Sequence, residues 1–192
     1  GCNNPHHLST PFLDRLATEG INFTDHTCSN PICSPARSSL LTGLYTRTHG
    51  LWENGYSLPK EIPGLAHWLS QAGYTCGLFG KAHFEPETSG YAAHLDHSQP
   101  YYGFSHFHIT EDNLIGEYLD WIEQNYPEHL EAALNNVVEG ARRYPLPDLG
   151  KGRLNAIYTS SLPAELHQTP WIAKCTQEFI RSCASKNKPF FA

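Results

Sequence analysis

Short apolar segments alternate along this chain with amphipathic segments of helical period, and this alternation constrains the fold more than any other feature. Helices that alternate with short apolar strands are typical of an α/β domain, in which helical layers cover a central sheet. The predicted strands span residues 21–24, 74–79 and 190–191. The predicted helices span residues 10–19, 34–42, 63–72, 112–122, 130–141 and 169–183.

Helix boundaries are marked by residues with a clear conformational reason. Thr10 and Pro11 form an N-cap and a first-turn proline, and Gly43 and Gly73 follow the second and third predicted helices. Between residues 85 and 110 the helical period is lost in a stretch rich in His, Tyr, Gly and Pro, which favours a long surface excursion. Residues 144–152 are predicted to form a loop.

The charge balance argues against a nucleic-acid partner. The 192 residues carry 13 Lys and Arg against 19 Asp and Glu, a net charge of −6 with neutral histidines. A phosphate backbone favours a basic surface instead. No segment approaches the roughly 20 apolar residues of a membrane helix, so no membrane-embedded part is expected.

The two ends of the sequence predict that the chain is part of a longer domain. It contains no Met, so Gly1 is not an initiator residue, and the missing signal peptide carries no information about compartment. At the other end, Phe190 and Phe191 follow a Lys-Pro pair like the beginning of a buried strand. We therefore expect residues 1–192 to form a partial catalytic domain, truncated at both ends.

Six cysteines are too sparse for a disulfide scaffold in a chain of this length. The absence of a C-x-x-C pair disfavours a structural zinc site. Cys76, Cys175 and Cys183 fall in apolar patterns and are predicted to be small buried side chains.

Residues 31–43 carry the clearest chemical signal. Cys33 precedes a predicted helix, where free N–H groups and the helix dipole favour an anion and would lower the pKa of a thiol. Arg37 follows one helical turn later, so its guanidinium can return to the same end of the helix. This combination suits a tetrahedral oxyanion, and the alternative is a buried cysteine beside a surface arginine.

This segment resembles the first signature of the type I, formylglycine-dependent sulfatases of the alkaline phosphatase superfamily. The pattern C-x-P-x-R is present as Cys33, Pro35 and Arg37, and an apolar pair and Thr-Gly complete it at residues 40–43. Residues 73–83 are similar to the second signature, G-Y-x-[ST] … G-K-x-H, with Lys81 and His83 in place. Cys76 and Phe79 depart from it. Residues 10–17 are similar to the helix that precedes the nucleophile in this family.

The resemblance implies an alkaline-phosphatase-like α/β sandwich with a central mixed sheet flanked by helices, and a sulfuric ester hydrolase. Cys33 would be oxidised to Cα-formylglycine, whose hydrate attacks the sulfur of a sulfate ester with one hydroxyl and releases sulfate through the other. That hydrate would also be a ligand of one Ca²⁺. Arg37 would steady the diol and the metal, Lys81 would pair with the sulfate, and His83 would contact the diol or assist the leaving group.

The remaining parts of such a site are expected outside the chain. The resemblance places two metal-binding aspartates before Gly1, and a His, a second metal-ligand pair and a second Lys after Ala192. The apolar faces of the helices at 11–19 and 170–183 are therefore expected to lack a complete partner layer.

Other polar residues have simpler interpretations. His94, Asp96, His97, His106 and His108 are expected to be solvated or hydrogen-bonded, and the functional alternative is that they line the substrate mouth. His49 is expected in a structural turn, and Asn22 begins an N-glycosylation sequon, a triplet that is common by chance.

Three alternative functions stay open. A phosphonate monoester or phosphodiester hydrolase of the same superfamily can use the same nucleophile motif. A non-catalytic binding module would keep Cys33 as a thiol, and a redox or phosphatase-like thiol enzyme is disfavoured because C-x-x-C and C-x5-R patterns are absent. The expected partners are a small-molecule or saccharide sulfate ester and, transiently, a formylglycine-generating enzyme. The resemblance favours a periplasmic, secreted or lysosomal location over the cytoplasm.

Overall fold

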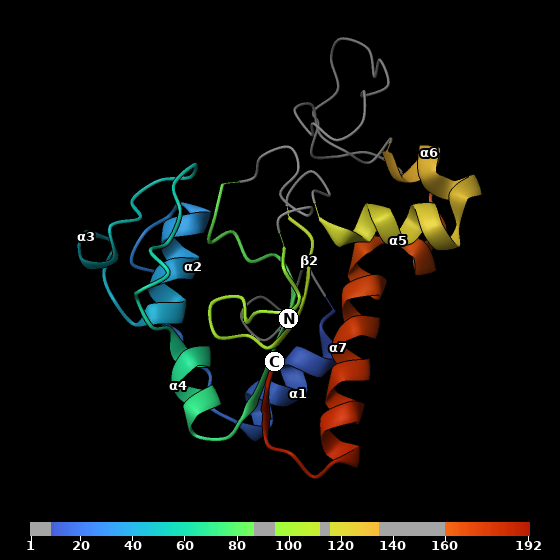
Figure 1. Ribbon diagram of the computed structural model, residues 1–192. Helices are drawn as coiled ribbons and strands as arrows, with labels where there is room; N and C mark the ends of the chain where they lie inside the picture. Colours follow the sequence, from blue (N-terminus) through green and yellow to red (C-terminus); the bar gives the residue numbers. More distant parts are fainter. Residues whose placement is uncertain (1–8, 87–94, 112–115, 135–159) are drawn as a thin grey trace.

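The computed structural model describes residues 9–86, 95–111, 116–134 and 160–192 (Figure 1). In chain order the elements are α1 (Pro11–Glu19), α2 (Cys33–Thr42), α3 (Thr46–His49), α4 (Leu65–Gln71), β1 (Thr75–Gly80), β2 (His106–Ile109), α5 (Glu117–Asn125), the 3₁₀ turn η3 (Pro127–His129), α6 (Leu130–Leu134), the 3₁₀ turn η4 (Ala164–Leu166), α7 (Gln168–Ser185) and β3 (Phe190–Phe191).

The three described strands form a parallel sheet in the order β2-β1-β3. Residues 77–80 of β1 pair with residues 106–109 of β2, and residues 75–76 pair with residues 190–191 of β3. Parallel neighbours need long crossover connections, and the chain between β2 and β3 contains α5, α6 and α7. The α/β class and the strands predicted at 74–79 and 190–191 are therefore confirmed, with β1 shifted by one residue.

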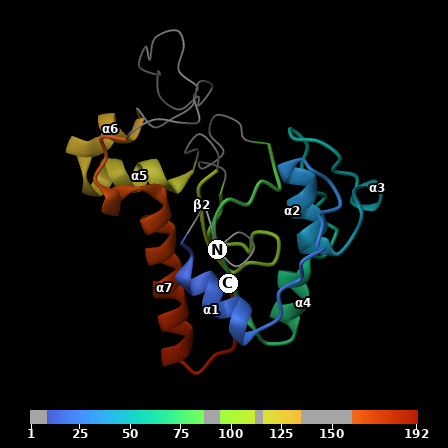
Figure 2. The same ribbon diagram turned by 180° about the vertical axis from the view of Figure 1, so that it is seen from behind.

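Helices cover the sheet from two sides (Figures 1 and 2). On one side, α2 and α4 enclose a core that includes Leu41, Ala66 and Cys76 together with Phe107 and Ile109 of β2. The intervening residues of β2 point the other way, and His106 and His108 contact Phe179 and Trp171 of α7, respectively. The period of two along β2 thus assigns its apolar side chains to one layer and its histidines to the other.

A second core joins α5, α6 and α7 through Tyr118, Ile122 and Trp171. The helix predicted from a cap at Asp112 instead begins at Glu117, and Asp112 lies outside the described residues. Gly116 precedes it with φ +129, and a Cβ there would lie 2.2 Å from the carbonyl oxygen of Ile109, so only glycine fits. The helix predicted over 130–141 is described only as far as Leu134.

The strand predicted at residues 21–24 is wrong, whereas the expectation that the helix at 11–19 lacks a complete partner layer fits the structure. Residues 21–24 form no strand, and Ile21 and Phe23 are 80% and 73% exposed. No strand of the described sheet pairs with this segment, so its apolar residues have no ladder to join. Helix α1 forms as predicted but buries none of its residues.

The expectation that the apolar face of the helix at 170–183 lacks a complete partner layer stays a prediction for α7, part of which is buried. Trp171, Phe179 and Cys183 are buried against the sheet and the second core. Among the described residues, α7 therefore buries side chains against the sheet, whereas α1 buries none.

Candidate functional site

Cys33 is the first residue of α2, one position further into the helix than the sequence predicted. Ile32 is the N-cap in an extended conformation, and the Cys33 side chain is half-buried. The first turn of a helix leaves backbone N–H groups without helical partners, and the helix dipole adds partial positive charge there. An anion bound beside Cys33 would be stabilised by both.

Asn54 is the nearest polar neighbour of the Cys33 side chain, and the sequence analysis missed it. Its Nδ2 and Oδ1 atoms lie 3.2 and 3.3 Å from the Cys33 Sγ atom. The same Oδ1 accepts the N–H of Ser34 at 3.2 Å, so the amide is anchored to the helix N-terminus. The only sequence signal was Asn-Gly, which marks a turn. The exposed rings of Trp52 and Tyr56 flank it along the chain, 5.6 Å apart.

Arg37 connects the helix to the end of the central strand. Its Nη1 donates a hydrogen bond of 2.9 Å to the carbonyl oxygen of Lys81. Lys81 follows Gly80, which ends β1 with φ +99, a left-handed conformation that glycine adopts without strain. The two motifs predicted from sequence, Cys33 with Arg37 and Lys81 with His83, are therefore joined directly at the carboxyl end of β1.

Glu111 holds the segment that carries Lys81 and His83, and no sequence motif identified this residue. Its Oε1 accepts the backbone N–H groups of Ala82 and His83 at 3.1 and 2.7 Å. His83 is buried, with φ +52, and Glu111 is only 2% exposed. Burial raises the pKa of Glu111, while the two N–H groups and the charges of Lys81 and Arg37 oppose the rise.

The histidines of the Tyr- and His-rich stretch gather elsewhere. His97 Nε2 and His108 Nδ1 lie 3.2 and 3.0 Å from Glu117 Oε1. This contact raises the pKa of His108, since a carboxylate favours the charged imidazole. His108 and Glu117 border a cavity of about 410 Å³ lined by residues of β2, α5 and α7. The expectation that these two histidines are hydrogen-bonded fits this arrangement.

The other residues singled out by sequence have local roles. The Asp96 carboxylate accepts the N–H of Ser98, and His106 Nδ1 lies 3.0 Å from the Ser105 hydroxyl, while His94 lies outside the described residues. Buried His49 accepts the N–H of Leu51 through Nδ1, so it serves the turn as expected. Asn22 is exposed, which leaves the sequon a prediction.

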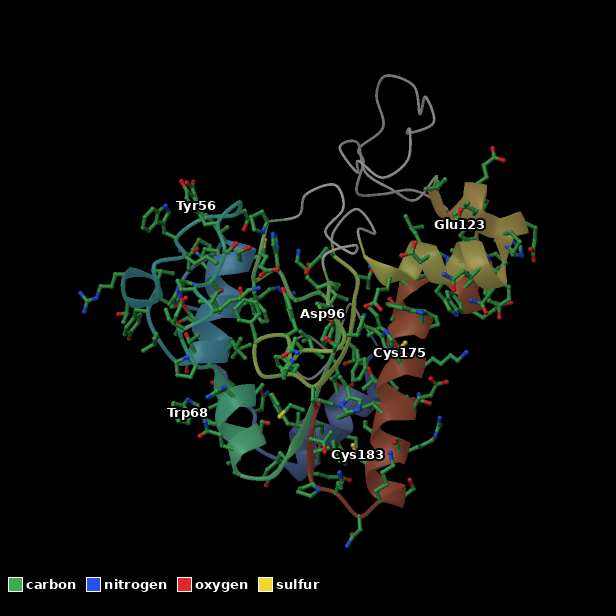
Figure 3. All side chains as sticks on the ribbon, in the orientation of Figure 1. Tyr56, Trp68, Asp96, Glu123, Cys175 and Cys183 are labelled. Atoms are coloured by element: carbon green, nitrogen blue, oxygen red, sulfur yellow. The ribbon has the colours of Figure 1, made fainter. Side chains whose placement is uncertain are left out.

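The five described cysteines are free thiols. Cys76 and Cys183 are buried as predicted, and Cys175 is half-buried. Cys175 and Cys183 both lie on α7 (Figure 3). Burial, with a smaller contribution from nearby carboxylates, raises the pKa of Cys175 to about 11, which makes this thiol unreactive.

A metal site is not completed by the part of the chain that the structure describes. Within those residues, no group of three or more His, Cys, Asp or Glu side chains is placed to hold a metal ion. Ca²⁺ prefers six to eight oxygen ligands, and only Cys33, as formylglycine, was predicted to supply one here. These residues alone therefore do not fit the cation.

None of the described helices is long and apolar enough to cross a bilayer.

Comparison with known proteins agrees with this geometry. The chain is 30% identical to arylsulfatase D of Homo sapiens over 155 residues, 75% of this chain and 25% of that protein. It is 29% identical to an arylsulfatase of Clostridium perfringens over 206 residues, 100% of this chain and 38% of that protein. The phosphonate monoester hydrolase of Agrobacterium radiobacter superposes with a TM-score of 0.63 at 26% identity, covering 96% of this chain and 35% of that structure.

The fold and the sequence relationships lead to one assignment. The described α/β layers match an alkaline-phosphatase-like hydrolase in space, and the chain spans 25–38% of the length of these relatives. The Sulfatase family model matches residues 1–192. The chain therefore belongs to the sulfatase family, within the alkaline phosphatase superfamily.

Proposed function

We propose that the whole protein is a sulfuric ester hydrolase whose nucleophile derives from Cys33. The observation that carries the proposal is the Arg37–Lys81 hydrogen bond, which joins the cysteine-bearing helix to the Lys81–His83 segment. Two separate signatures of the family thereby become parts of one site. Because the chain spans a minor part of its relatives, the proposal concerns the full-length protein.

In this proposal, Cys33 is oxidised to formylglycine, whose hydrate supplies the nucleophilic hydroxyl. The residues around it favour such a group. Cys33 is half-buried at a helix N-terminus, so it is accessible and its surroundings favour developing negative charge. The Asn54 amide, which now contacts Sγ, can exchange hydrogen bonds with an oxygen at this position.

Lys81 and His83 act on the substrate. Lys81 neutralises the sulfate as a compact charge, and His83 contacts the nucleophile or delivers a proton to the departing alcohol. Arg37 keeps the first turns of α2 and the end of β1 at a fixed separation through the Lys81 carbonyl. The exposed rings of Trp52 and Tyr56 provide a surface for the organic part of the ester, either a saccharide or an aryl group.

Ca²⁺ and the cellular context belong to the same proposal. Formylglycine at position 33 is one ligand of a divalent cation, and the other ligands lie outside the described residues. The catalytic roles above therefore involve only this chain's own side chains. A formylglycine-generating enzyme is the transient partner, and a periplasmic, secreted or lysosomal compartment suits the family resemblance.

Mass spectrometry and kinetics test the nucleophile in the full-length protein coexpressed with a formylglycine-generating enzyme. The peptide containing Cys33 should carry an aldehyde, and Cys33→Ala should lose sulfate-ester hydrolysis by at least about 10³-fold. Cys28→Ala is the matched control, since Cys28 is an exposed free thiol that should not affect turnover. A thiol that stays unmodified while a control sulfatase is converted would favour the binding module.

A second candidate is a phosphonate monoester or phosphodiester hydrolase. The specific reason is the structural similarity to the phosphonate monoester hydrolase of Agrobacterium radiobacter. Rates measured side by side on aryl sulfate, aryl phosphonate and phosphodiester substrates distinguish the two. The sulfatase proposal expects the highest kcat/KM for the sulfate ester, and a preference for the phosphonate or the diester would replace it with the alternative.

A further inference from the structure

Glu111 is an acidic residue in a buried position, where the loss of hydration of its carboxylate destabilises the folded state. The residue follows β2 and is 2% exposed. Its Oε1 accepts two backbone hydrogen bonds, from Ala82 at 3.1 Å and from His83 at 2.7 Å. Its Oε2 is buried and finds no hydrogen-bond partner among the described residues. Removing a carboxylate from water disfavours folding unless partners compensate it.

Charges from two elements accompany this carboxylate. Lys81 at the end of β1 and Arg37 of α2 both favour the ionised form of Glu111. Arg37 also donates to the Lys81 carbonyl, so the strand end is held from the helix on one side and from Glu111 on the other. The segment between Gly80 and His83 is thus restrained by side chains that are distant in sequence.

The restrained segment has a conformation that would not persist by itself. His83 has φ +52, in the left-handed region that L-residues with a Cβ adopt at an energetic cost. The N–H of the same residue makes the shorter of the two bonds to Glu111. A backbone in such a region is maintained when its surroundings determine it from several directions.

We propose that Glu111 is a positioning residue of the candidate site, which fixes Lys81 and His83 for catalysis by binding the backbone between them. The inference rests on the proposed function in one respect, that Lys81 and His83 act on the substrate. Glu111 touches no reacting atom in this role. Its oxygen sets the path of the backbone, and the backbone sets where the two side chains project.

The test uses four variants of the full-length protein. Glu111→Ala removes the acceptor, and Glu111→Asp keeps the charge but withdraws the oxygen from the two N–H groups. Glu111→Gln keeps a carbonyl oxygen at the same reach. Glu85→Gln is the matched control, because Glu85 lies two residues after His83 and contacts Lys60 and Tyr102 instead.

We expect Glu111→Ala and Glu111→Asp to lower kcat/KM for a sulfate ester at least about tenfold, per mole of formylglycine. Glu111→Gln and Glu85→Gln should stay within about threefold. In a His83→Ala background, Glu111→Ala should add less than about threefold, because residues that act through one another are not additive. If the loss in kcat/KM of the double variant equals the product of the losses of the two single variants, Glu111 has a merely structural role and the inference is overturned.

Hydrogen exchange of the peptide containing Ala82 and His83 gives a readout that is independent of activity. Glu111→Asp disturbs the core less than Glu111→Ala and should raise the exchange rate of this peptide at least about tenfold. Glu111→Gln should leave the exchange rate near that of the wild type. An unchanged exchange rate in Glu111→Asp would refute the positioning role of Glu111. If the exchange rate rises in Glu111→Asp while the wild-type protein hydrolyses no sulfate ester, the proposed function is wrong but Glu111 still positions this backbone segment.

Discussion

Two glutamates from neighbouring parts of the chain serve as hydrogen-bond acceptors in very different regions. Glu111 at the carboxyl end of β2 accepts two backbone N–H groups and is almost completely buried. Glu117 at the beginning of α5 accepts the N–H of Ile109 at 2.8 Å but otherwise meets the side chains of His97 and His108. The Glu117 side chain remains 21% exposed, and both imidazoles are about half exposed.

The difference shows what distinguishes a rigid site from a group of ionisable side chains. Around Glu111, the backbone that follows β1 is bound by the side chain of Arg37 in α2 and by Glu111 after β2, so its position is determined from several elements. Around Glu117, solvent competes with the histidine contacts, and rotamer freedom reduces their contribution. The proposed function places catalysis in the Cys33 region, and for the Glu117 region we expect only a pH-dependent contribution to stability.

The largest expected effect separates the two regions by activity. In the full-length protein, Lys81→Ala and His83→Ala should each lower kcat/KM about 30- to 1,000-fold, about 2–4 kcal/mol of transition-state stabilisation. Lys81→Arg should not restore the rate, because a planar guanidinium does not replace a compact ammonium. Lys60→Ala, at an exposed ion pair, is the control. Wild-type kinetics in both alanine variants would place these residues outside the site.

The rate at which Cys175 is alkylated tests how the Glu117 region differs from the protein surface. Cys175 lines the cavity bordered by Glu117, and its pKa of about 11 lies two units above the ordinary value of 9.0. The thiolate reacts with alkylating agents, so half-buried Cys175 should react at least about tenfold more slowly than exposed Cys28 at pH 8. Peptide mass spectrometry after timed iodoacetamide treatment measures the rates. Equal rates at Cys175 and Cys28 would mean that the α5–α7 cavity is as open as the surface.

The link between α2 and β1 predicts a smaller effect, on stability. Arg37→Ala removes a charged donor from the Lys81 carbonyl and should lower the free energy of unfolding by about 1.5–3 kcal/mol. Denaturant unfolding of the full-length protein measures it. Arg15→Ala, which removes an exposed pair with Glu19, should cost less than about 0.5 kcal/mol. Equal costs for the two arginines would mean that the link does not restrain the site.

The smallest effect concerns His108. Its pKa is raised in the folded protein by Glu117, with Glu178 contributing and burial opposing, so the contribution to stability is complete below the unfolded pKa of 6.5. It is lost as the pH rises through the higher folded pKa. His108→Gln should therefore lower the free energy of unfolding, measured with denaturant, at pH 5.5 but not at pH 8.5, by less than about 1 kcal/mol because the side chain is half exposed. A loss that grows with pH would contradict this sign.

Local patterns accounted for much of the fold. The alternation of helices and strands predicted the α/β class, and β1 and β3 were found within one residue of their predicted positions. The spacing of Cys33 and Arg37 is a property of one helix, so it could be derived without the tertiary structure. Lys81 and His83 were identified by their resemblance to the second signature of the family, and their catalytic roles remain predictions.

Burial along α1 and residues 21–24 could not be derived in the same way. An apolar face predicts that a helix or strand can pack, but it does not specify what is available to pack against. In the structure these segments remain exposed, while α7 with a similar pattern is buried. The difference lies in the neighbours that the fold supplies.

The sequence by itself determined the α/β class, most of the helices, strands β1 and β3, the nucleophile candidate Cys33 and the Arg37 side chain one turn later, because each depends on residues close together in the chain. Strand β2 lies in the stretch predicted as a surface excursion, since its pairing with β1 is a long-range contact. Only the tertiary structure decided which distant groups support them. Asn54 lies 21 positions from Cys33, and Glu111 lies 28 positions from His83. Both side chains make hydrogen bonds to residues that are distant in sequence. The Glu111 contact exists only after parallel strand pairing brings the ends of β1 and β2 to the same edge of the sheet.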